Sequence, residues 1–392
     1  MREVVIVSGA RTPIGDFLGT LKDFSAVQLG TIALKAAIDR AGIQPAQVEE
    51  VIAGHVYQAG CKGNPARQVT LGAGCPVETV SMTTNQQCAS SMRAVEIISQ
   101  EIMAGKIDIG AAVGHESMTN IPYLLLKART GYRMGSDRCE DGMMYDAFID
   151  PFYNYHAGVT AENLVEMYGI PRREQDEWGL MSHQRACRAI AEGKFKEEIV
   201  PVEVKTRKGT VLFDTDEHPN PNVTMEGLEK LKPAFKKDGT ITAGNASAIN
   251  DGAAAVVLMG ADKARELGVK PLARIVATAS ASVDPKIMGI GVVPAVRRAL
   301  KFAGMSLEDM ELCEFNEAFA AQVIACNREL QVPVEKINVL GSGVSLGHPV
   351  GMTGVRLLVT LMHEMRRSNK QFGIASLCSG GGPAMATIIE AL

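Results

Sequence analysis

The chain has 392 residues, a formal net charge of −4 at pH 7 and a pI of about 6.0. It lacks the basic excess of a general nucleic-acid-binding protein, and no apolar run approaches the ~20 residues of a membrane-spanning helix. Hydrophobic residues make up 46% and aromatic residues only 5%, with 39 glycines, as in many α/β enzymes. We therefore predict a globular α/β protein with no nucleic-acid and no membrane partner.

The first third of the chain alternates strand and helix signals. Met1-Arg-Glu-Val-Val-Ile-Val-Ser8 resembles a first strand, centred on 4–7 and broken at Gly9, rather than a signal or transit peptide, so we expect a cytoplasmic protein. Residues 25–41 have helical periodicity, with Ser25 as N-cap and Gly42 as stop. Later signals predict strands at 48–54 and 109–114 and helices at 65–72 and 90–104.

Charge, aromatic residues and turn residues rise between 118 and 249, which indicates a loop domain inserted over the core. Two helices are predicted inside it, at 157–168 and 172–192, and Trp178 is interpreted as helix packing. A buried strand follows at 253–259.

Residues 271–392 repeat the pattern of the first third. The predicted elements are a strand at 273–277, a helix at 294–303, a strand at 312–315, a helix opened by Asn316, and a strand at 373–377 that runs into Cys378. We therefore predict two similar halves, 1–118 with 249–270 and 271–392, around an inserted domain at 119–248. The functional site should lie where helix N-termini from the two halves meet, because their dipoles favour developing oxyanions.

The eight cysteines are scattered and form no CxxC pair, so neither a disulfide framework nor a zinc site is expected. Two of them lie in turns of small residues. Cys88, in Asn85-Gln-Gln-Cys-Ala-Ser-Ser91, is the candidate nucleophile, because a thiol at a helix N-terminus has a lowered pKa. Cys378, in Cys378-Ser-Gly-Gly-Gly-Pro-Ala384, is the candidate second acid/base. The alternative for both is a buried structural cysteine.

His348 lies in Gly347-His348-Pro349, where few side chains can crowd it, and is the candidate base for Cys88. Asn316 fits an oxyanion-binding role, with a helix N-cap as the alternative. Glu317 either tunes this site or faces solvent. The glycines after Ser379 let backbone N–H groups, that of Gly380 among them, approach a substrate oxygen.

These motifs resemble the thiolase family, the acetyl-CoA acetyltransferases and 3-ketoacyl-CoA thiolases, over essentially the whole chain. The blocks that carry the resemblance are Gly9-Ala-Arg-Thr-Pro-Ile-Gly15, the Cys88 block, Tyr155-His156, Thr160-Ala-Glu-Asn163, Thr242-Ala-Gly-Asn-Ala-Ser247, Asp251-Gly-Ala-Ala-Ala255, Asn316–Ala320, Gly347–Pro349 and Cys378–Gly382.

The resemblance implies a five-layered fold of two βαβαβαββ halves, assembled as a homodimer or homotetramer. It implies that Cys88 is acylated, that His348 activates it and that Cys378 handles the α-proton. One oxyanion hole would come from Asn316 (through a water) and His348, and the other from the N–H groups of Cys88 and Gly380. The implied residues around coenzyme A and the acyl group are His156, Ala157, Phe235, Ala243, Ser247 and Phe319.

The implied activity is reversible acyl transfer in fatty acid metabolism, with coenzyme A as a substrate and no metal or redox cofactor. The leading hypothesis is the acetoacetyl-CoA reaction (acetoacetyl-CoA + CoA ⇌ 2 acetyl-CoA). The alternative is a thiolase for longer or branched acyl chains, because Ala157 stands where the biosynthetic members usually have Met.

Other departures from the family pattern are Ser91 and Ser342 in place of Gly, Pro383-Ala384 in place of Gln-Gly, Asn220 in place of Arg and Gly227 in place of Ser. Because of Ser91, Ser342 and Pro383, a non-catalytic thiolase-like subunit is a further alternative. A ketoacyl-synthase-like condensing enzyme is disfavoured by Cys378.

Overall fold

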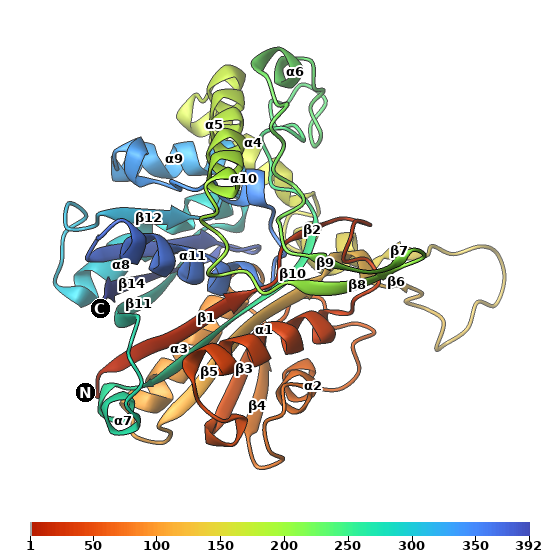
Figure 1. The fold of residues 1–392 in the computed structure, drawn as a ribbon. Helices are drawn as coiled ribbons and strands as arrows, with labels where there is room; N and C mark the ends of the chain where they lie inside the picture. The colour runs from red at the N-terminus through yellow and green to blue at the C-terminus, as the bar shows by residue number, and fades with distance from the viewer. Residues whose placement is uncertain (1) are drawn as a thin grey trace.

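Two halves of the chain repeat one order of strands and helices in the computed structural model, which describes residues 2–392 (Figure 1). The first half follows the order βαβαβαββ. Its elements are β1 (Val4–Arg11), α1 (Ala26–Ala41), β3 (Glu50–Gly54), α2 (Pro65–Gly72), β4 (Val80–Thr84), α3 (Ser90–Met103), β5 (Ile109–Ser117) and β10 (Asn250–Gly260).

The second half has the same order with one strand reduced. Its elements are β11 (Ala273–Ser282), α8 (Val292–Ala303), β12 (Leu312–Phe315), α9 (Ala320–Leu330), the short α10 (Gly343–Leu346), α11 (Thr353–Arg367), β13 (Phe372–Cys378) and β14 (Pro383–Ala391). Where the third strand of a full repeat would lie, Ile337 forms a single parallel bridge to Cys313 of β12. The repeat predicted from sequence is therefore confirmed, apart from this strand.

The strands form one continuous sheet in the order β12-β13-β14-β11-β1-β10-β5-β3-β4, with β2 (Gly15–Asp16) paired to β10. The two halves join where β1 and β11 run antiparallel for two residue pairs, Val5 with Arg274 and Ile6 with Ala273. Helices α1 and α2 cover the outer face of the first half, and α8 and α9 that of the second. Since α3 and α11 lie between the two halves of the sheet, the fold has five layers, as predicted.

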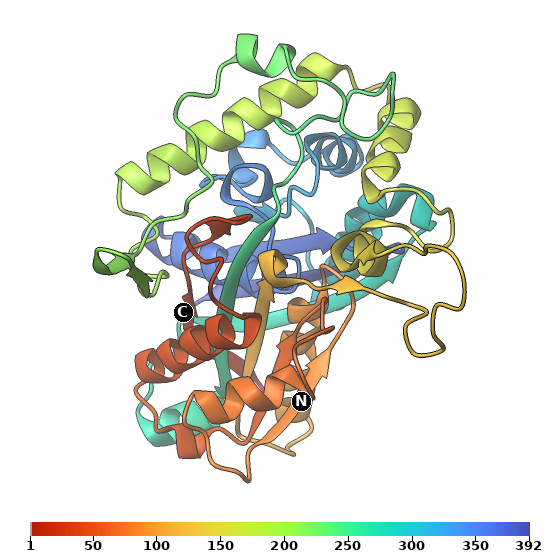
Figure 2. The ribbon, with the colours of Figure 1, turned by 90° about the vertical axis from the view of Figure 1, so that its right-hand side faces the viewer.

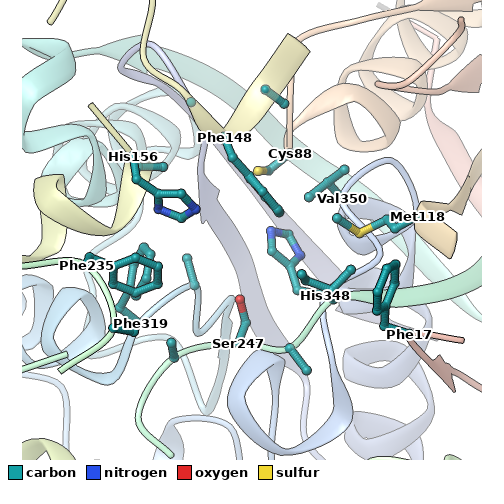
Figure 3. A pocket seen from close by; sticks show the side chains of 18 of the residues that line it. Phe17, Cys88, Met118, Phe148, His156, Phe235, Ser247, Phe319, His348 and Val350 are labelled. Carbon is teal, nitrogen blue, oxygen red and sulfur yellow. The ribbon is translucent and has the colours of Figure 1, made fainter. Parts of the chain in front are cut away.

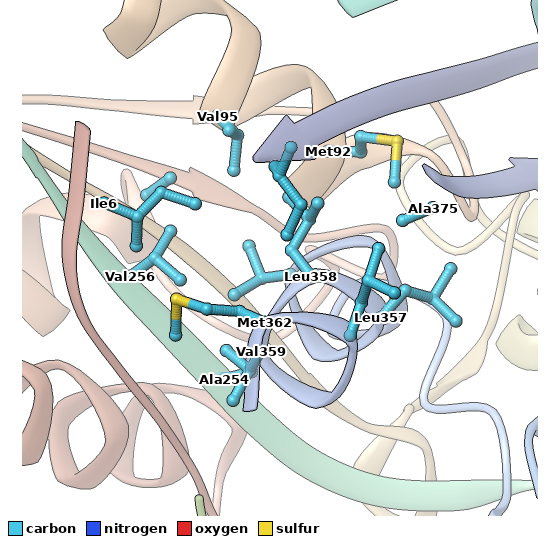
Figure 4. Packing of buried hydrophobic residues seen from close by; sticks show 14 of the residues in the cluster. Ile6, Met92, Val95, Ala254, Val256, Leu357, Leu358, Val359, Met362 and Ala375 are labelled. Atoms are coloured by element: carbon cyan, nitrogen blue, oxygen red, sulfur yellow. The ribbon is translucent and has the colours of Figure 1, made fainter. Parts of the chain in front are cut away.

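The middle layer forms the core. Helix α11 is buried from Thr353 to Met365, as expected for a helix that is enclosed on all sides. Leu357, Leu358 and Met362 of α11 pack with Met92 of α3 and with strand residues such as Val256 of β10 (Figure 4).

The insert between β5 and β10 lies over one end of these layers (Figures 1 and 2). It contains β6 (Tyr123–Leu124), β7 (Glu140–Asp141), a π-helical turn (Met144–Phe148), α4 (Ala157–Tyr168), α5 (Arg172–Ala191), β8 (Val202–Thr206), β9 (Gly209–Phe213) and α6 (Met225–Glu229). The two predicted helices are confirmed, and the segment between β6 and β7 projects from the body of the fold.

A buried ion-pair network fastens the insert to the core. The Arg11 guanidinium, fully buried at the end of β1, donates to Glu198 Oε1 at 2.6 Å and to both carboxylate oxygens of Asp216 at 2.7 and 2.8 Å. Its plane lies over the Phe195 ring, 5.0 Å from the centroid. Phe195, Glu198 and Asp216 all belong to the insert. The Arg11 side chain of the core therefore contacts two segments of the insert, one at 195–198 and one at Asp216.

Local signals set several boundaries correctly. Ser25 and Gln28 form a capping box at the start of α1, and Gly42 ends it in the left-handed region at φ 68°. Strand β1 runs past Gly9 to Arg11, against the predicted break, because β10 pairs with it along that stretch.

One predicted helix start is wrong. Asn316 does not open a helix, since α9 begins at Ala320, and Asn316 is therefore no N-cap. Long-range hydrogen bonds to the neighbouring Glu317 override the local pattern there. The predicted strand that runs into Cys378 is confirmed as β13, and it leads into the turn before β14, where Gly381 and Gly382 have φ of 80° and 100°.

Replacing Asp216 with Ala should lower the free energy of unfolding by about 3–5 kcal/mol, because it leaves the buried Arg11 charge partly unpaired. Asp214→Ala, two residues away on an exposed segment, is the matched control and should change stability by less than about 0.5 kcal/mol. Urea denaturation followed by circular dichroism measures both. Equal midpoints for the two variants would contradict the role given to the network.

Candidate active site

A cavity of about 560 Å³ lies where the two halves and the insert meet. In Figure 3 the Cys88 sulfur and the His348 imidazole face this space, with His156, Phe235 and Phe319 on the opposite side. Nine of the eleven predicted site residues line it: Cys88, His156, Ala157, Phe235, Ala243, Ser247, Phe319, His348 and Gly380. The other two, Asn316 and Cys378, lie behind its wall, so the structure brings the predicted set together.

Cys88 lies in a tight turn between β4 and α3. The preceding residue, Gln87, has φ 50°, a left-handed conformation that a non-glycine residue rarely adopts. Asn85 holds it there, because its Oδ1 accepts from the Gln87 N–H at 2.9 Å and its Nδ2 donates to the Val56 carbonyl at 3.1 Å. This strained turn aims the thiol at the cavity.

Ser379 joins the Cys88 turn to the glycine turn. Its hydroxyl donates to the Gln86 carbonyl at 2.5 Å and accepts from the Ala89 N–H at 3.1 Å. Since Gly380 follows Ser379 directly, its N–H is brought beside the Cys88 sulfur, as is the N–H of Cys88 itself. Within residues 2–392 no protein oxygen accepts from these two N–H groups, which leaves them able to bind a substrate oxyanion.

The protonation state predicted for Cys88 is wrong. Burial raises the pKa of its thiol to about 11, and the N–H groups of Gly380 and Cys88 offset only part of this effect. Helix α3 begins two residues later, with Ala89 as N-cap, so its N-terminus does not outweigh the effect of burial on the pKa of Cys88. At neutral pH the nucleophile is therefore a thiol that needs a base.

His348 is arranged to be that base. Its Nδ1 lies 2.6 Å from Thr353 Oγ1, and this hydroxyl donates its hydrogen to the Pro349 carbonyl at 3.0 Å. The hydroxyl can then only accept from the imidazole, so Nδ1 carries the hydrogen and Nε2 presents a lone pair. Nε2 lies 3.4 Å from the Asn316 amide nitrogen. Burial first, and then the Arg356 charge, lower the pKa of His348 to about 3, which keeps the imidazole neutral.

The backbone around His348 is fixed by Asn250 of β10. Its Oδ1 accepts from the His348 N–H at 3.0 Å. Gly347 has φ 98°, and a Cβ there would lie 2.5 Å from the Asn250 side chain. Only glycine fits, which explains why the histidine follows a glycine in the sequence.

Asn316 and Glu317 are held by contacts from far along the chain. Asn316 is fully buried beside His348, and its Oδ1 has no partner within residues 2–392. Glu317 is buried rather than facing solvent, and its carboxylate accepts from Trp178 Nε1 at 3.1 Å, Ser182 Oγ at 2.6 Å and Asn338 Nδ2 at 2.9 Å. These bonds hold the segment before α9 out of a helix and join α5 to the second half.

Cys378 lies buried at the end of β13 and is 1% exposed. Burial first, and then the neighbouring Cys88, raise the pKa of its thiol well above the usual value. It is therefore protonated at neutral pH and close to the nucleophile, as a proton donor to a carbanion must be.

His156 faces the same cavity with the opposite tautomer. As N-cap of α4, its Nδ1 accepts from the Gly158 N–H at 3.0 Å, so Nε2 carries the hydrogen. Burial lowers the pKa of His156. Its ring stacks on that of Phe235 with the centroids 4.5 Å apart, and the Phe319 ring meets Phe235 edge-on with the centroids 6.0 Å apart. The cavity thus contains one imidazole that accepts and one that donates.

Further lining residues were not predicted. Gln87, Ala318 and Val350 are sequence neighbours of the motifs, and that adjacency is a signal that could have found them. Phe17, Met118, Phe148, His218 and Met288 come from other parts of the chain and carry no such signal.

Three departures from the family pattern have structural roles, and two lie off the cavity. The Ser91 hydroxyl joins α3 to α11 through the Val355 N–H and the Met352 carbonyl. The Ser342 hydroxyl accepts from Arg356 Nη2 at 3.0 Å, and Pro383 begins β14. Asn220 and Gly227 are not among the residues that line the cavity.

Two family models together match nearly the whole chain, the thiolase N-terminal domain over residues 4–262 and the thiolase C-terminal domain over residues 269–391. An acetyl-CoA acetyltransferase of Syntrophomonas wolfei is 51% identical over 395 residues, covering 100% of both chains, and one of Pseudomonas aeruginosa is 50% identical over 387 residues, covering 98% of each. The solved structure of human mitochondrial 3-ketoacyl-CoA thiolase is 42% identical, with a TM-score of 0.98 and coverage of 100% of this chain and 99% of that one.

No helix within residues 2–392 is both long enough and apolar enough to cross a membrane. Among the same residues, no cluster of three or more His, Cys, Asp or Glu side chains is arranged to hold a metal ion.

Thr353→Val should reduce kcat about 10- to 100-fold with little change in KM, because it removes the group that orients His348 and fixes its tautomer. Thr360→Val, on the same helix and equally buried, is the matched control, since its hydroxyl bonds Glu198 away from the cavity. Steady-state kinetics of acetoacetyl-CoA thiolysis measures both variants. A Thr353→Val enzyme as active as Thr360→Val would contradict the assigned role.

Alkylation of Cys88 by iodoacetamide should keep accelerating through pH 9. With the thiol pKa raised to about 11 and the His348 pKa lowered to about 3, the pair is neutral across the physiological range, and thiolate appears only as pH rises. Mass spectrometry of the peptide that contains Cys88 gives the rate, with the Cys88→Ala protein as the blank. A rate that is already flat below pH 7 would indicate a preformed thiolate–imidazolium pair instead.

Proposed function

The chain belongs to the thiolase family, and from this premise we propose that it catalyses acetoacetyl-CoA + CoA ⇌ 2 acetyl-CoA. The observation that carries the proposal is the meeting, in one cavity, of the Cys88 thiol, a neutral His348 with its Nε2 lone pair, and the two free N–H groups of Cys88 and Gly380. The relatives named acetyl-CoA acetyltransferase support acetyl as the transferred group.

In the first half-reaction His348 Nε2 takes the Cys88 proton, and the sulfur attacks the thioester carbonyl carbon of acetyl-CoA. The carbonyl oxygen becomes an oxyanion, which the N–H groups of Cys88 and Gly380 stabilise. The carbonyl then re-forms from the oxyanion, the bond to the coenzyme A sulfur breaks, and this sulfur leaves with the proton that His348 holds. Cys88 is then acetylated.

In the second half-reaction Cys378 first passes its own proton to His348, and as a thiolate it removes an α-proton from a second acetyl-CoA, whose enolate oxygen is stabilised near Asn316 and His348. The carbanion attacks the acetyl group on Cys88 and the carbon–carbon bond forms. The bond between the acetyl carbonyl carbon and the Cys88 sulfur then breaks, and Cys88 leaves with the proton that His348 holds. Thiolysis is the same sequence in reverse, with Cys378 protonating the departing carbanion. We propose that coenzyme A takes part as a substrate and that no metal or redox cofactor is needed.

The walls of the cavity support the proposed substrate class. Phe235 and Phe319 offer an apolar surface for the pantetheine, and Ser247 adds a hydroxyl beside it. His156 would donate from Nε2 toward the acyl thioester. Its tautomer suits a carbonyl oxygen, which can only accept a hydrogen bond.

A broader substrate range is the second candidate, and a second chamber favours it. This chamber, of about 310 Å³, lies beside the first and shares Gln87, Ala147, Ala157, Met288 and Gly380 with it. Ala157 thus borders both spaces, and its small side chain leaves room for an acyl chain longer than acetoacetyl or branched at C2.

We also propose that the protein is a homodimer or homotetramer, cytoplasmic and active in fatty acid metabolism. Two exposed apolar regions support assembly. One consists of Val80 and Met82 on the edge strand β4 with Val77 just before it. The other consists of Tyr123 of β6 and of Leu125, Leu126, Tyr132 and Met134 in the projecting segment. All eight cysteines are free, as in a reducing compartment.

The purified protein should cleave acetoacetyl-CoA in a CoA-dependent manner, and Cys88→Ala should lose at least about 10⁴-fold in kcat because no acyl-enzyme can form. Loss of the enolate absorbance of the substrate measures turnover. Incubation with radiolabelled acetyl-CoA should label the wild type and not the variant. A wild type that is neither active nor labelled would favour a non-catalytic thiolase-like subunit.

Ala157→Met should fill the space that the small side chain leaves between the two chambers. Activity on a C6 or 2-methyl 3-ketoacyl-CoA is expected to fall more than about 10-fold, while acetoacetyl-CoA thiolysis changes by less than about threefold. The ratio of kcat/KM for the two substrates is the readout. An unchanged ratio, or a wild type with no activity on longer chains, would remove the second candidate.

A further inference from the structure

A buried carboxylate lies beneath the active site and takes no part in the steps above. Glu116, near the end of β5, is fully buried and accepts three backbone hydrogen bonds. Its Oε2 accepts from the N–H of Val56 at 3.0 Å and of Gly351 at 3.1 Å, and its Oε1 from the N–H of Tyr57 at 3.3 Å. One oxygen therefore receives hydrogen bonds from two segments far apart in the sequence.

Each of these segments leads to one member of the catalytic pair. Gly351 is three residues after His348 in the same loop. The Val56 carbonyl accepts from Asn85 Nδ2, and Asn85 in turn holds the strained Gln87 next to Cys88. The Glu116 carboxylate is thus the point where the loop of the base and the loop of the nucleophile are tied together.

There is little room for this contact to shift. A Cβ added at Gly351 would lie 2.6 Å from Glu116 Oε2 and 2.6 Å from the His115 carbonyl oxygen. Because buried segments packed this closely move only together, the carboxylate fixes both loops in one arrangement.

A cation accompanies the carboxylate. His55 Nε2 lies 3.1 Å from Glu116 Oε1, and both side chains are 1% exposed. Burial opposes protonation of His55, but the Glu116 charge, helped by Cys61, raises the pKa of the imidazole to about 9. The ring of His115 lies 4.4 Å from that of His55 and is itself fixed by a 2.9 Å contact between Nδ1 and the Ala26 carbonyl. The Glu116 carboxylate thus has the His55 imidazole as a partner beside its three backbone donors.

We propose that Glu116, paired with His55, is a positioning residue that sets the distance between Cys88 and His348. Its role in catalysis rests on the proposed acetyl transfer, but its effect on the Cys88–His348 pair does not. An amide in its place must turn an NH₂ group either toward the N–H groups of Val56 and Gly351 or toward that of Tyr57. Donor would then face donor, and at least one loop would move.

The chain offers a matched control in Glu162 of α4. This carboxylate is also buried, and its Oε1 accepts two backbone bonds, from Thr240 at 2.7 Å and Ile241 at 2.8 Å. Both of these donors lie in the insert, and neither leads to Cys88 or His348. Glu116→Gln and Glu162→Gln therefore make the same chemical change at comparable depth.

The decisive experiment compares the two variants by the rate of Cys88 alkylation with iodoacetamide at pH 8, by kcat and KM for acetoacetyl-CoA, and by thermal unfolding. Glu116→Gln should slow alkylation about 10-fold and reduce kcat about 100-fold with KM within about threefold. Glu162→Gln should leave alkylation within about twofold of wild type. Equal alkylation rates in the two variants would overturn the proposal.

The alkylation arm needs no turnover, so it tests the positioning even if acetoacetyl-CoA proves not to be a substrate. His55→Asn adds a double-mutant cycle, in which the double variant should be little worse than Glu116→Gln alone because the two side chains act as one unit. If Glu116→Gln does not fold, His55→Gln gives the test, since it keeps the carboxylate and removes the cation. Alkylation as fast as in the wild type would then overturn the proposal.

Discussion

The active site depends on how closely α3 and α11 cross between the two halves of the sheet. The Ser91 hydroxyl, in the first turn of α3, accepts from the Val355 N–H at 3.1 Å and donates to the Met352 carbonyl at 3.2 Å. It therefore caps α11 from a different helix, since Met352 at the N-cap position supplies no side-chain bond. The crossing is tight, because a Cβ at Gly354 would lie 2.5 Å from the Met92 nitrogen. Cys88 lies just before one of these helices and His348 just before the other, so this contact brings their two loops to the same place.

Sequence reasoning succeeded where the determinants are local. The helices at Pro65–Gly72 and Ala157–Tyr168 and the strand at Leu312–Phe315 have the predicted bounds, because caps, glycine stops and apolar runs lie within a few residues of the ends they set. It failed at Asn316, where the side chains of Trp178 and Ser182 satisfy the following Glu317 from more than a hundred residues away. Such bonds leave no trace in the local pattern.

The same division applies to the site. The motifs supplied the residues around the cavity, whereas His218 and Met288 reach it only through the packing of the insert and the second half, which periodicity does not describe. The predicted direction of the Cys88 pKa shift was wrong for a related reason. The proximity of a helix N-terminus can be read from sequence, but the degree of burial that outweighs it cannot. The Cys88 thiol and the His348 imidazole are therefore both neutral at physiological pH.

The repeat of the two halves has a consequence for how this chemistry could arise. Cys88 precedes α3 and His348 precedes α11, the corresponding helices of the two repeats, so the proposed nucleophile and the proposed base occupy equivalent places. A symmetric pair of identical half-chains would put the same side chain at both places, either two thiols or two imidazoles. Such a pair could not supply one thiol and one imidazole. Covalent fusion of the halves removes that restriction, because each copy can then be substituted independently. A single polypeptide that contains both halves can therefore place two unlike groups at these equivalent positions.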